Sequence, residues 1–196
     1  MSTERPAYTE RLARLEGARW KRVLNVQAPY AWNARRVCRG RTLDIGCGIG
    51  RNLAHLGDRA VGVDHNATSV EVARRRGYRA HTADAFASTG DAVAGSYDTL
   101  LFAHVLEHML RKDAVALVES YLPYLREDGG RVVAICPQEA GYRSDASHVE
   151  FLDAAALRTL LAEAGFSVVE SRSFPFPRVA GRVFPYNEFV VVGERS

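Results

Sequence analysis

Residues 43–50 read LDIGCGIG, a short apolar run that leads into three glycines at alternate positions. Gly46, Gly48 and Gly50 allow the backbone to turn tightly and to approach a ligand closely. Their spacing is GxGxG, whereas a loop that holds a dinucleotide pyrophosphate usually reads GxGxxG. Asp44 lies two residues before the first glycine, and a carboxylate there suits a cationic or amino-acid ligand better than a pyrophosphate. The stretch predicts a strand, a ligand-binding loop and the start of a helix.

Outward from this loop, short β-rich runs alternate with helical runs along the chain. The expected strands lie at 41–46, 60–64, 78–84, 97–103, 129–137, 166–174 and 187–194. The expected helices between them lie at 51–56, 67–77, 113–125 and 153–165. This alternation predicts an α/β fold, in which helices cover both faces of a doubly wound, mostly parallel seven-stranded sheet. Only the last two strands lack an intervening helix, so we expect them to pair antiparallel across the Pro-rich segment 175–187.

The N-terminal part of the chain follows a different pattern. Residues 8–38 read as helical, and Gly17 and Pro29 are expected to break this segment into two helices. Residues 1–41 hold ten Lys or Arg against three Glu, a net charge of +7 (10 − 3), whereas the whole chain carries +3. Such a basic arm can bind nucleic acid or an anionic substrate. The wide spacing of the arginines favours the alternative, a solvated helix face.

Length and composition indicate one globular domain. The chain has 196 residues, of which 47% are hydrophobic and 25% charged, and no apolar run approaches the ~20 residues that span a bilayer. Its three cysteines form no CxxC pair, which argues against a disulfide framework. We therefore expect a single domain over 1–196, with a helical lid at 1–40 and an α/β core at 41–196. We also expect a cytoplasmic protein that does not enter a membrane.

Two further aspartates end expected strands. Asp64 closes the second strand, twenty residues after Asp44, where a carboxylate can accept hydrogen bonds from ribose hydroxyls. Asp84 closes the third, at the carboxyl edge where open α/β sheets bind ligands. Each aspartate alone is better explained as a helix cap. Three acids at successive strand ends beside a glycine loop predict a nucleoside site.

At this point the chain resembles a known family, the class I S-adenosylmethionine-dependent methyltransferases, and within it the type 11 group. The resemblance covers residues 41–194 and rests on five motifs in order: LDIGCGIGRNL at 43–53, AVGVDHN at 60–66, TADAF at 82–86, YDTLLFAHVLEHM at 97–109 and EDGGRVVAICP at 127–137. It implies a Rossmann-like methyltransferase fold with an antiparallel last strand. It also implies that S-adenosylmethionine is the cofactor.

The same resemblance implies roles for individual residues. The methionine end of the cofactor would be lined by Asp44, Gly46, Cys47, Gly48 and Gly50. The ribose and adenine would be held by Asp64, His65, Asp84 and Ala85, and the sulfonium flanked by Phe102, Ala103 and His104. Arg51 is a candidate partner for the cofactor carboxylate, with a solvated helix residue as the alternative.

The stretch HVLEH at 104–108 places His104, Glu107 and His108 on one face if it begins a helix. His148, in the loop after the fifth strand, is expected to approach this turn and to complete a four-ligand metal site. The pattern is similar to that of metal-dependent small-RNA 2′-O-methyltransferases and, in part, of quinone-biosynthesis O-methyltransferases. Those families have glutamate where this chain has His104. The imidazole-rich set suits zinc or iron better than magnesium.

Simpler interpretations of HVLEH remain open. The two histidines can be a helix cap and a half-buried core residue, with Glu107 in solvent. Alternatively His108 or His148 acts as a general base without a metal. Methyl transfer is an in-line displacement, so the protein mainly aligns the nucleophile with the methyl group.

Three functional classes follow. The leading prediction is O-methylation of a small molecule by an S-adenosylmethionine-dependent methyltransferase, assisted by a bound metal if the ligand set is occupied. The alternatives are an RNA methyltransferase that uses the basic arm, and a non-catalytic S-adenosylmethionine-binding module. The aromatic segment 174–186 is expected to wall a pocket for a planar or apolar acceptor or, alternatively, to form a subunit contact. A monomer and a homodimer are both compatible with the sequence.

Overall fold

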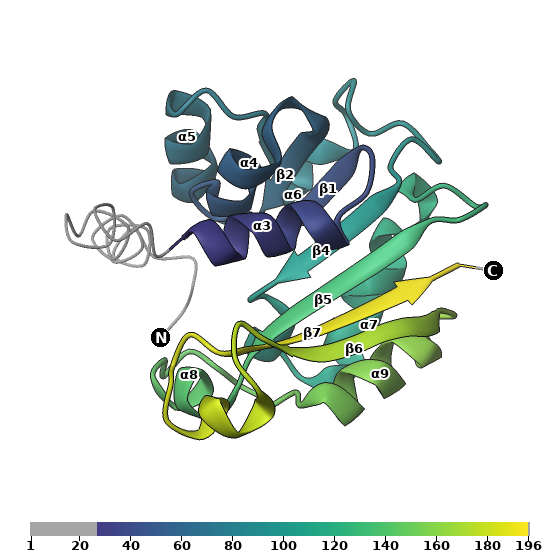
Figure 1. The fold of residues 1–196 in the computed structure, drawn as a ribbon. Helices are drawn as coiled ribbons and strands as arrows, with labels where there is room; N and C mark the ends of the chain where they lie inside the picture. Colours follow the sequence, from purple (N-terminus) through teal and green to yellow (C-terminus); the bar gives the residue numbers. More distant parts are fainter. Residues whose placement is uncertain (1–26, 196) are drawn as a thin grey trace.

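A computed structural model describes residues 27–195 of the chain, and these residues form one seven-stranded sheet with helices on both faces (Figure 1). The strands are β1 (Thr42–Ile45), β2 (Ala60–Asp64), β3 (Ala80–Thr82), β4 (Thr99–Ala103), β5 (Arg131–Pro137), β6 (Ser167–Phe174) and β7 (Glu188–Glu194). Their order across the sheet is β3-β2-β1-β4-β5-β7-β6. The strands from β1 to β5 pair in parallel, and β7 runs antiparallel to β5 and β6. The predicted doubly wound sheet with one antiparallel last strand is therefore confirmed.

The helices follow the predicted alternation. They are α3 (Ala28–Val37), α4 (Arg51–Leu56), α5 (Ala67–Arg75), α6 (Ala83–Phe86), α7 (Arg111–Tyr121), α8 (Glu139–Arg143) and α9 (Ala154–Glu163). Four short 3-10 helices join them: η1 (Gly57–Arg59), η2 (Leu106–His108), η3 (Leu122–Tyr124) and η4 (Arg178–Arg182). The carboxyl ends of β1 to β5 meet at one rim of the sheet.

The sheet is buried on both faces. In β4, Leu100 and Phe102 join an apolar cluster with α7 and α9, whereas Leu101 and Ala103 join a second cluster with α3, α4 and α5. Alternate residues of a strand point to opposite faces, so a strand that is apolar throughout needs a helix layer on each side. Every residue of β1, β2, β4 and β5 is buried, as this arrangement requires.

The described part of the predicted N-terminal lid is α3, which is fastened to the sheet. Arg172 of β6 donates a hydrogen bond to the side chain of the buried Asn33, and Arg36 pairs with Glu170. The buried Arg131 donates to the carbonyl of Val37 at the end of the helix (3.1 Å). Together these contacts hold α3 against the β5, β7 and β6 side of the sheet.

The first turn of α3 contains Pro29, a position at which proline fits because the first N–H groups of a helix have no partner within the helix. The sequence predicts a break in the helical segment at Pro29, and in the structure Pro29 lies in the first turn of α3. The predicted break at Gly17 and the rest of the expected first helix lie outside the described residues.

The stretch 104–108 differs from the expected helix start. Residues 106–108 form the 3-10 turn η2, and α7 begins only at Arg111. His104 has φ of 60°, a left-handed conformation that cannot belong to a right-handed helix. The chain turns sharply at this point, and Leu106 and Glu107 are both buried with no exposed surface.

Within residues 27–195, no helix is both long enough and apolar enough to cross a membrane.

Candidate functional site

The glycine loop joins β1 to α4 at the carboxyl rim of the sheet. Gly46 and Gly48 have φ of +76° and +53°, which glycine adopts without strain. A Cβ atom added at Gly46 would lie 2.8 Å from the Val105 side chain. The N–H of Gly48 donates a hydrogen bond to Asp64 Oδ2 (2.8 Å), so the loop and the end of β2 are fixed together.

Asp44, in β1, is the most enclosed acid beside this loop. Its side chain is fully buried, and Oδ1 accepts a hydrogen bond from the amide of Asn52 (3.4 Å). Its Oδ2 has no hydrogen-bond partner among residues 27–195. Burial raises the pKa of Asp44 to about 7, although Asn52 and the charge of Arg51 act in the opposite direction. A buried carboxylate oxygen without a partner indicates that a bound group supplies the missing donor.

The carboxylate of Asp64 lies between the glycine loop and α5. Besides Gly48, it accepts a hydrogen bond from the N–H of Asn66 (2.8 Å), and His65 Nδ1 lies 3.5 Å away. The helix cap of α5 is Asn66, which accepts from two N–H groups of the first turn. The helix-cap explanation of Asp64 is therefore wrong.

Asp84 and Ala85 are exposed in the first turn of α6, directly after β3. The residue at the N-cap position of α6 is Thr82, so Asp84 is not the cap either. Asp44 thus lies in β1, Asp64 ends β2 and Asp84 follows β3, so the three acids lie near the carboxyl ends of successive strands, as predicted.

The side chains of two residues predicted at the cofactor, Phe102 and Cys47, are buried, so these residues could contact the cofactor only through their backbone atoms. Phe102 is fully buried in the core beneath α7, because it points to the opposite face from Ala103. Its side chain therefore cannot flank a sulfonium above the rim, which corrects that expectation. Cys47 is also buried, and its Sγ fills the space that a side chain at Gly62 would need.

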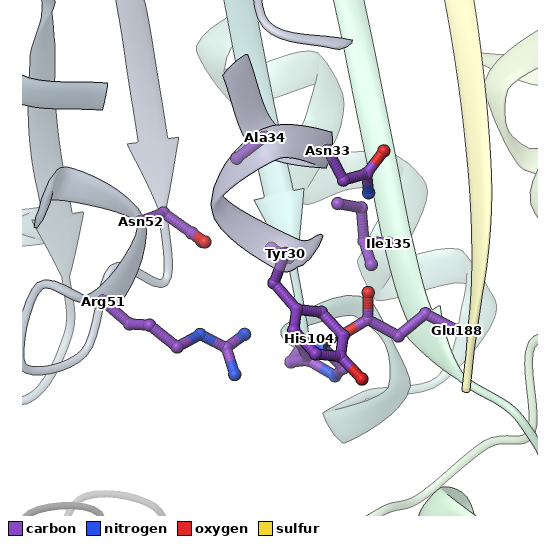
Figure 2. Close-up of a pocket in the computed structure, with 9 residues that line it drawn as sticks. Tyr30, Asn33, Ala34, Arg51, Asn52, His104, Ile135 and Glu188 are labelled. Carbon is purple, nitrogen blue, oxygen red and sulfur yellow. Dashed lines mark hydrogen bonds and ion pairs between the residues drawn. The ribbon is translucent and has the colours of Figure 1, made fainter. Parts of the chain in front are cut away.

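A pocket lies between α3, the start of α4 and the ends of β4, β5 and β7 (Figure 2). It is lined by Tyr30, Asn33, Ala34, Arg51, Asn52, Ala103, His104, Ile135 and Glu188. Figure 2 shows Arg51 and Glu188 approaching His104 and Tyr30 from opposite sides. The Tyr30 hydroxyl donates to the carbonyl of Tyr186 (2.8 Å), and burial followed by the charge of Glu188 raises the pKa of Tyr30 well above its usual range.

His104 occupies the centre of this region. Its Nε2 lies 2.8 Å from Glu188 Oε1, and its Nδ1 lies 3.4 Å from Glu107 Oε1. Burial lowers the pKa of His104, but the two carboxylates more than offset this and raise it to about 9. His104 is thereby held between two acids rather than left free as a metal ligand.

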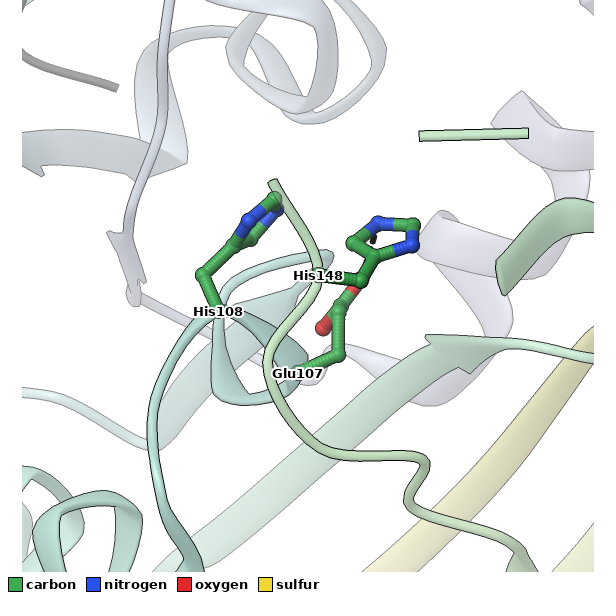
Figure 3. Close-up of side chains that lie close together, drawn as sticks. All are labelled: Glu107, His108 and His148. Atoms are coloured by element: carbon green, nitrogen blue, oxygen red, sulfur yellow. Dashed lines mark ion pairs between the residues drawn. The ribbon is translucent and has the colours of Figure 1, made fainter. Parts of the chain in front are cut away.

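Glu107, His108 and His148 form a compact cluster beside this histidine (Figure 3). One ligand atom from each of the three lies within 4.8 Å of the other two. His104, the fourth predicted ligand, is not in this group, which reduces the predicted set to three. The imidazole rings of His108 and His148 have centroids 4.8 Å apart.

The hydrogen bonds of the cluster orient its ligand atoms. His108 Nδ1 lies 3.1 Å from the Ser147 carbonyl and His148 Nδ1 lies 2.7 Å from the Tyr142 carbonyl. A carbonyl can only accept, so both Nδ1 atoms carry hydrogen, and in a neutral imidazole of this tautomer Nε2 presents a lone pair. Metal-binding histidines are held in this way.

Glu107 is fully buried, and its two oxygens differ. Oε2 accepts from Cys136 Sγ (3.4 Å), whereas Oε1 receives no well-formed hydrogen bond among residues 27–195. Burial acts to raise the pKa of Glu107, but His104 and His108 hold it below its usual value. Burial lowers the pKa of His108, which favours the neutral imidazole. An ionised carboxylate and neutral imidazoles are the protonation states that ligate a metal.

Six pocket residues were not among the predicted site residues: Tyr30, Asn33, Ala34, Asn52, Ile135 and Glu188. Asn52 is the second residue of α4, and its amide reaches Asp44 across the loop. Glu188 begins β7, where a charged residue opens the apolar run 189–192. That isolated charge is the one signal by which the sequence could have drawn attention to it.

Comparisons with known proteins agree with this architecture. The sequence profile of a methyltransferase domain family matches residues 11–171. A ubiquinone biosynthesis O-methyltransferase of Chelativorans sp. (strain BNC1) is 37% identical over 105 residues, which cover 48% of this chain and 39% of that protein. The chain thus matches about two fifths of the length of this curated relative.

Solved structures share the fold at low identity. A possible histamine N-methyltransferase of Thermotoga maritima superposes with a TM-score of 0.66 at 18% identity, covering 96% of this chain and 98% of that one. A 1,6-didemethyltoxoflavin-N1-methyltransferase of Burkholderia thailandensis, solved with bound S-adenosylhomocysteine, gives 0.61 at 18% identity, covering 100% of this chain and 91% of that one. With the profile match over most of the sequence, the chain belongs to the methyltransferase domain family.

Proposed function

We propose that the protein transfers the methyl group of S-adenosylmethionine to a hydroxyl oxygen of a small planar molecule. The observation that carries the cofactor assignment is the unpaired, buried Oδ2 of Asp44 beside the glycine loop. A methionine ammonium would supply its missing donor, and Arg51, which lines the pocket nearby, would take the methionine carboxylate. In the reaction the bond from sulfur to methyl breaks, a bond from oxygen to methyl forms, and the hydroxyl proton leaves.

The acceptor class is supported by Tyr30, which lines the pocket, and by a group of aromatic residues beyond it. The rings of Tyr30 and Trp32 contact Phe174, and Phe184 contacts both Phe176 and Tyr186. Phe176 and Tyr186 are about half exposed. Such side chains suit a planar or apolar acceptor. The ubiquinone O-methyltransferase similarity supports oxygen as the receiving atom.

The cluster of Glu107, His108 and His148 fits a divalent transition ion. Its donor set is Glu107 Oε1, which lies 3.4 Å from His104 Nδ1 and 4.0 Å from His148 Nε2, and two imidazole nitrogens whose other nitrogens are fixed by carbonyls. Nitrogen-rich sets of this kind suit zinc or iron better than magnesium. When bound, such an ion lowers the pKa of a coordinated hydroxyl. Without an ion, the lone pair of His108 or His148 is the base that accepts the hydroxyl proton.

The RNA alternative rests on the basic arm, of which only residues 27–41 are described. All four arginines in that part are occupied: Arg35 bonds the His55 carbonyl, Arg36 pairs with Glu170, Arg39 with Glu194 and Arg41 with Asp91. They therefore contribute little to a surface that neutralises phosphates. A salt-independent transfer rate would exclude RNA as the acceptor.

The decisive experiment measures methyl transfer from labelled S-adenosylmethionine to a panel of phenols and to total RNA. We expect labelled phenyl ethers and no labelled RNA, and the reverse result would overturn the proposal. Metal analysis of purified protein and of the His148→Ala variant tests the ion. If the wild type and His148→Ala contain the same amount of metal and a chelator does not slow turnover, His148 does not bind an ion, and its role is that of a base.

A further inference from the structure

The least expected conformation at the rim is that of His104. A residue other than glycine with φ of 60° is uncommon, and its cost persists only where the surroundings enforce it. Here the backbone N–H of His104 donates to the Ile135 carbonyl (2.8 Å), and both ring nitrogens face carboxylates. The imidazole is thus fixed in place and has no N–H left to offer a ligand.

Glu188 is the second member of this arrangement, and it is the acid that reaches the pocket. The side chain is 7% exposed and Oε1 is occupied by His104 Nε2 at 2.8 Å. Its Oε2 has no hydrogen bond from any other residue in the range 27–195, and Glu188 lines the pocket. The carboxylate therefore presents one bound oxygen and one open oxygen.

The backbone beneath Glu188 is held on both sides. Glu188 pairs with Pro137 of β5 and with Phe174 of β6 at the start of β7. Its carbonyl accepts a hydrogen bond from the buried Gln138 amide (3.0 Å). An acid on a fixed strand end, with one oxygen anchored, is pre-organised to select among ligands.

We propose that Glu188 is the residue that recognises the methyl acceptor, through a hydrogen bond from an acceptor O–H or N–H to its open Oε2. Arg51, on the opposite side of the pocket, is left for the cofactor carboxylate. A ligand with a carboxylate or phosphate at this position would meet the Glu188 charge and be rejected. This inference rests on the proposed function and adds a chemical class: acceptors with a neutral or cationic donor beside the reacting atom.

Three small aromatic probes test it without knowledge of the natural acceptor. Phenol, benzylamine and benzoate are titrated into the complex with S-adenosylhomocysteine, and binding is followed by nuclear magnetic resonance. We expect the wild-type complex to bind phenol and benzylamine at least fivefold more tightly than benzoate. Glu188→Gln should weaken benzylamine at least fivefold and phenol less than threefold, because an amide oxygen still accepts a hydrogen bond.

Glu163→Gln, which changes an exposed acid of α9 paired with Arg111, is the matched control and should alter none of the three. Equal binding of benzoate and benzylamine by the wild type, no detectable binding of phenol and benzylamine, or an equal loss of all three in Glu188→Gln would overturn the inference. A loss of S-adenosylhomocysteine affinity above threefold in Glu188→Gln would also do so, since it would place Glu188 at the cofactor. Failure of the wild type to bind S-adenosylhomocysteine would instead refute the proposed function.

Discussion

The proposed cofactor side and the proposed acceptor side of the rim are constructed differently. On the cofactor side, Asp44, the glycine loop and Asp64 lie within about twenty residues, and the backbone N–H groups of Gly48 and Asn66 both bond the Asp64 carboxylate. On the acceptor side, His104, Glu107, His148 and Glu188 come from segments up to 84 residues apart and meet through their side chains. The proposed cofactor side is thus local in the sequence, whereas the proposed acceptor side depends on contacts between distant segments.

The largest effect is expected where the cofactor side depends on the backbone. Gly48→Leu places a side chain on a left-handed residue of the loop that we propose to contact the cofactor. We expect the affinity for S-adenosylhomocysteine to fall by about 100-fold or more, measured by calorimetry. Gly57→Leu is the control, because Gly57 has φ of +66° but no neighbouring atom within 4 Å of an added Cβ. Equal affinities in the two variants would show that the loop does not contact the cofactor.

A smaller loss is expected from the one side chain that joins the loop to β2. Asp64→Ala removes the acceptors for the N–H groups of Gly48 and Asn66 together with the acceptors that we propose for the ribose hydroxyls. Loss of such buried hydrogen bonds should weaken cofactor binding by about 1–3 kcal/mol. The calorimetric comparison uses Asp58→Ala, an exposed acid of η1, which should bind as the wild type does. An unchanged affinity in Asp64→Ala would leave this aspartate a purely structural role.

The protonation of Asp44 predicts a pH effect of intermediate size. Burial raises its pKa to about 7, and a cofactor ammonium requires the ionised form. The apparent affinity for S-adenosylhomocysteine should therefore increase about tenfold from pH 6 to pH 8, following the ionised fraction. Asp44→Asn should abolish this dependence. A flat wild-type profile would contradict the assignment.

The same group affects folding with the opposite sign. Its pKa in the folded state lies above the unfolded value, so the folded state binds more protons between about pH 4 and pH 7. The Asp44 contribution to the stability of the cofactor-free protein is therefore lost as the pH rises through this window. The free energy of unfolding is measured in urea at pH 5 and pH 7, for the wild type and for Asp44→Asn. The difference between the two proteins distinguishes the Asp44 contribution from that of other titrating groups.

The smallest effect concerns α3, which belongs to the acceptor side. Arg172→Ala leaves the Asn33 side chain buried without its partner. We expect the free energy of unfolding to fall by about 1–2 kcal/mol in urea titrations, with little change in cofactor affinity. Arg158→Ala, on the exposed face of α9, should be neutral. A large loss of cofactor affinity in Arg172→Ala would show that the acceptor side and the cofactor side are energetically coupled.

How much of each side could be predicted from the sequence depends on whether its residues are close together along the chain. The strand alternation, the antiparallel β7 and the positions of Asp44, Asp64 and Asp84 could be predicted because each depends on local sequence. The approach of His148 to Glu107 and His108 also could, because it follows from the neighbouring positions of β4 and β5. The side chain of Phe102 could not be placed, because an unbroken apolar strand does not reveal which residues face which layer.

The side-chain arrangement of the acceptor side could not be predicted from the sequence, for a different reason. A helix start was the natural expectation for HVLEH, and nothing local announces a left-handed histidine at 104. The side-chain partner of His104, Glu188, lies 84 residues away and is brought near by the pairing of β5 with β7. Tyr30 and Asn52 likewise acquire their roles through partners that no spacing rule connects.

The three cysteines give the molecule a set of internal reporters. Cys47 lies in the glycine loop, Cys136 beneath Glu107 and Cys38 at the end of α3, and all three are buried free thiols. Burial raises the pKa of Cys38 to about 12 and that of Cys47 and Cys136 well above the usual value, so the folded state holds them as unreactive thiols. A thiol reagent can therefore modify each one only during a transient opening of its own region. The labelling rate at each cysteine, read by mass spectrometry, would measure how often the cofactor loop, the acceptor cluster and α3 open separately.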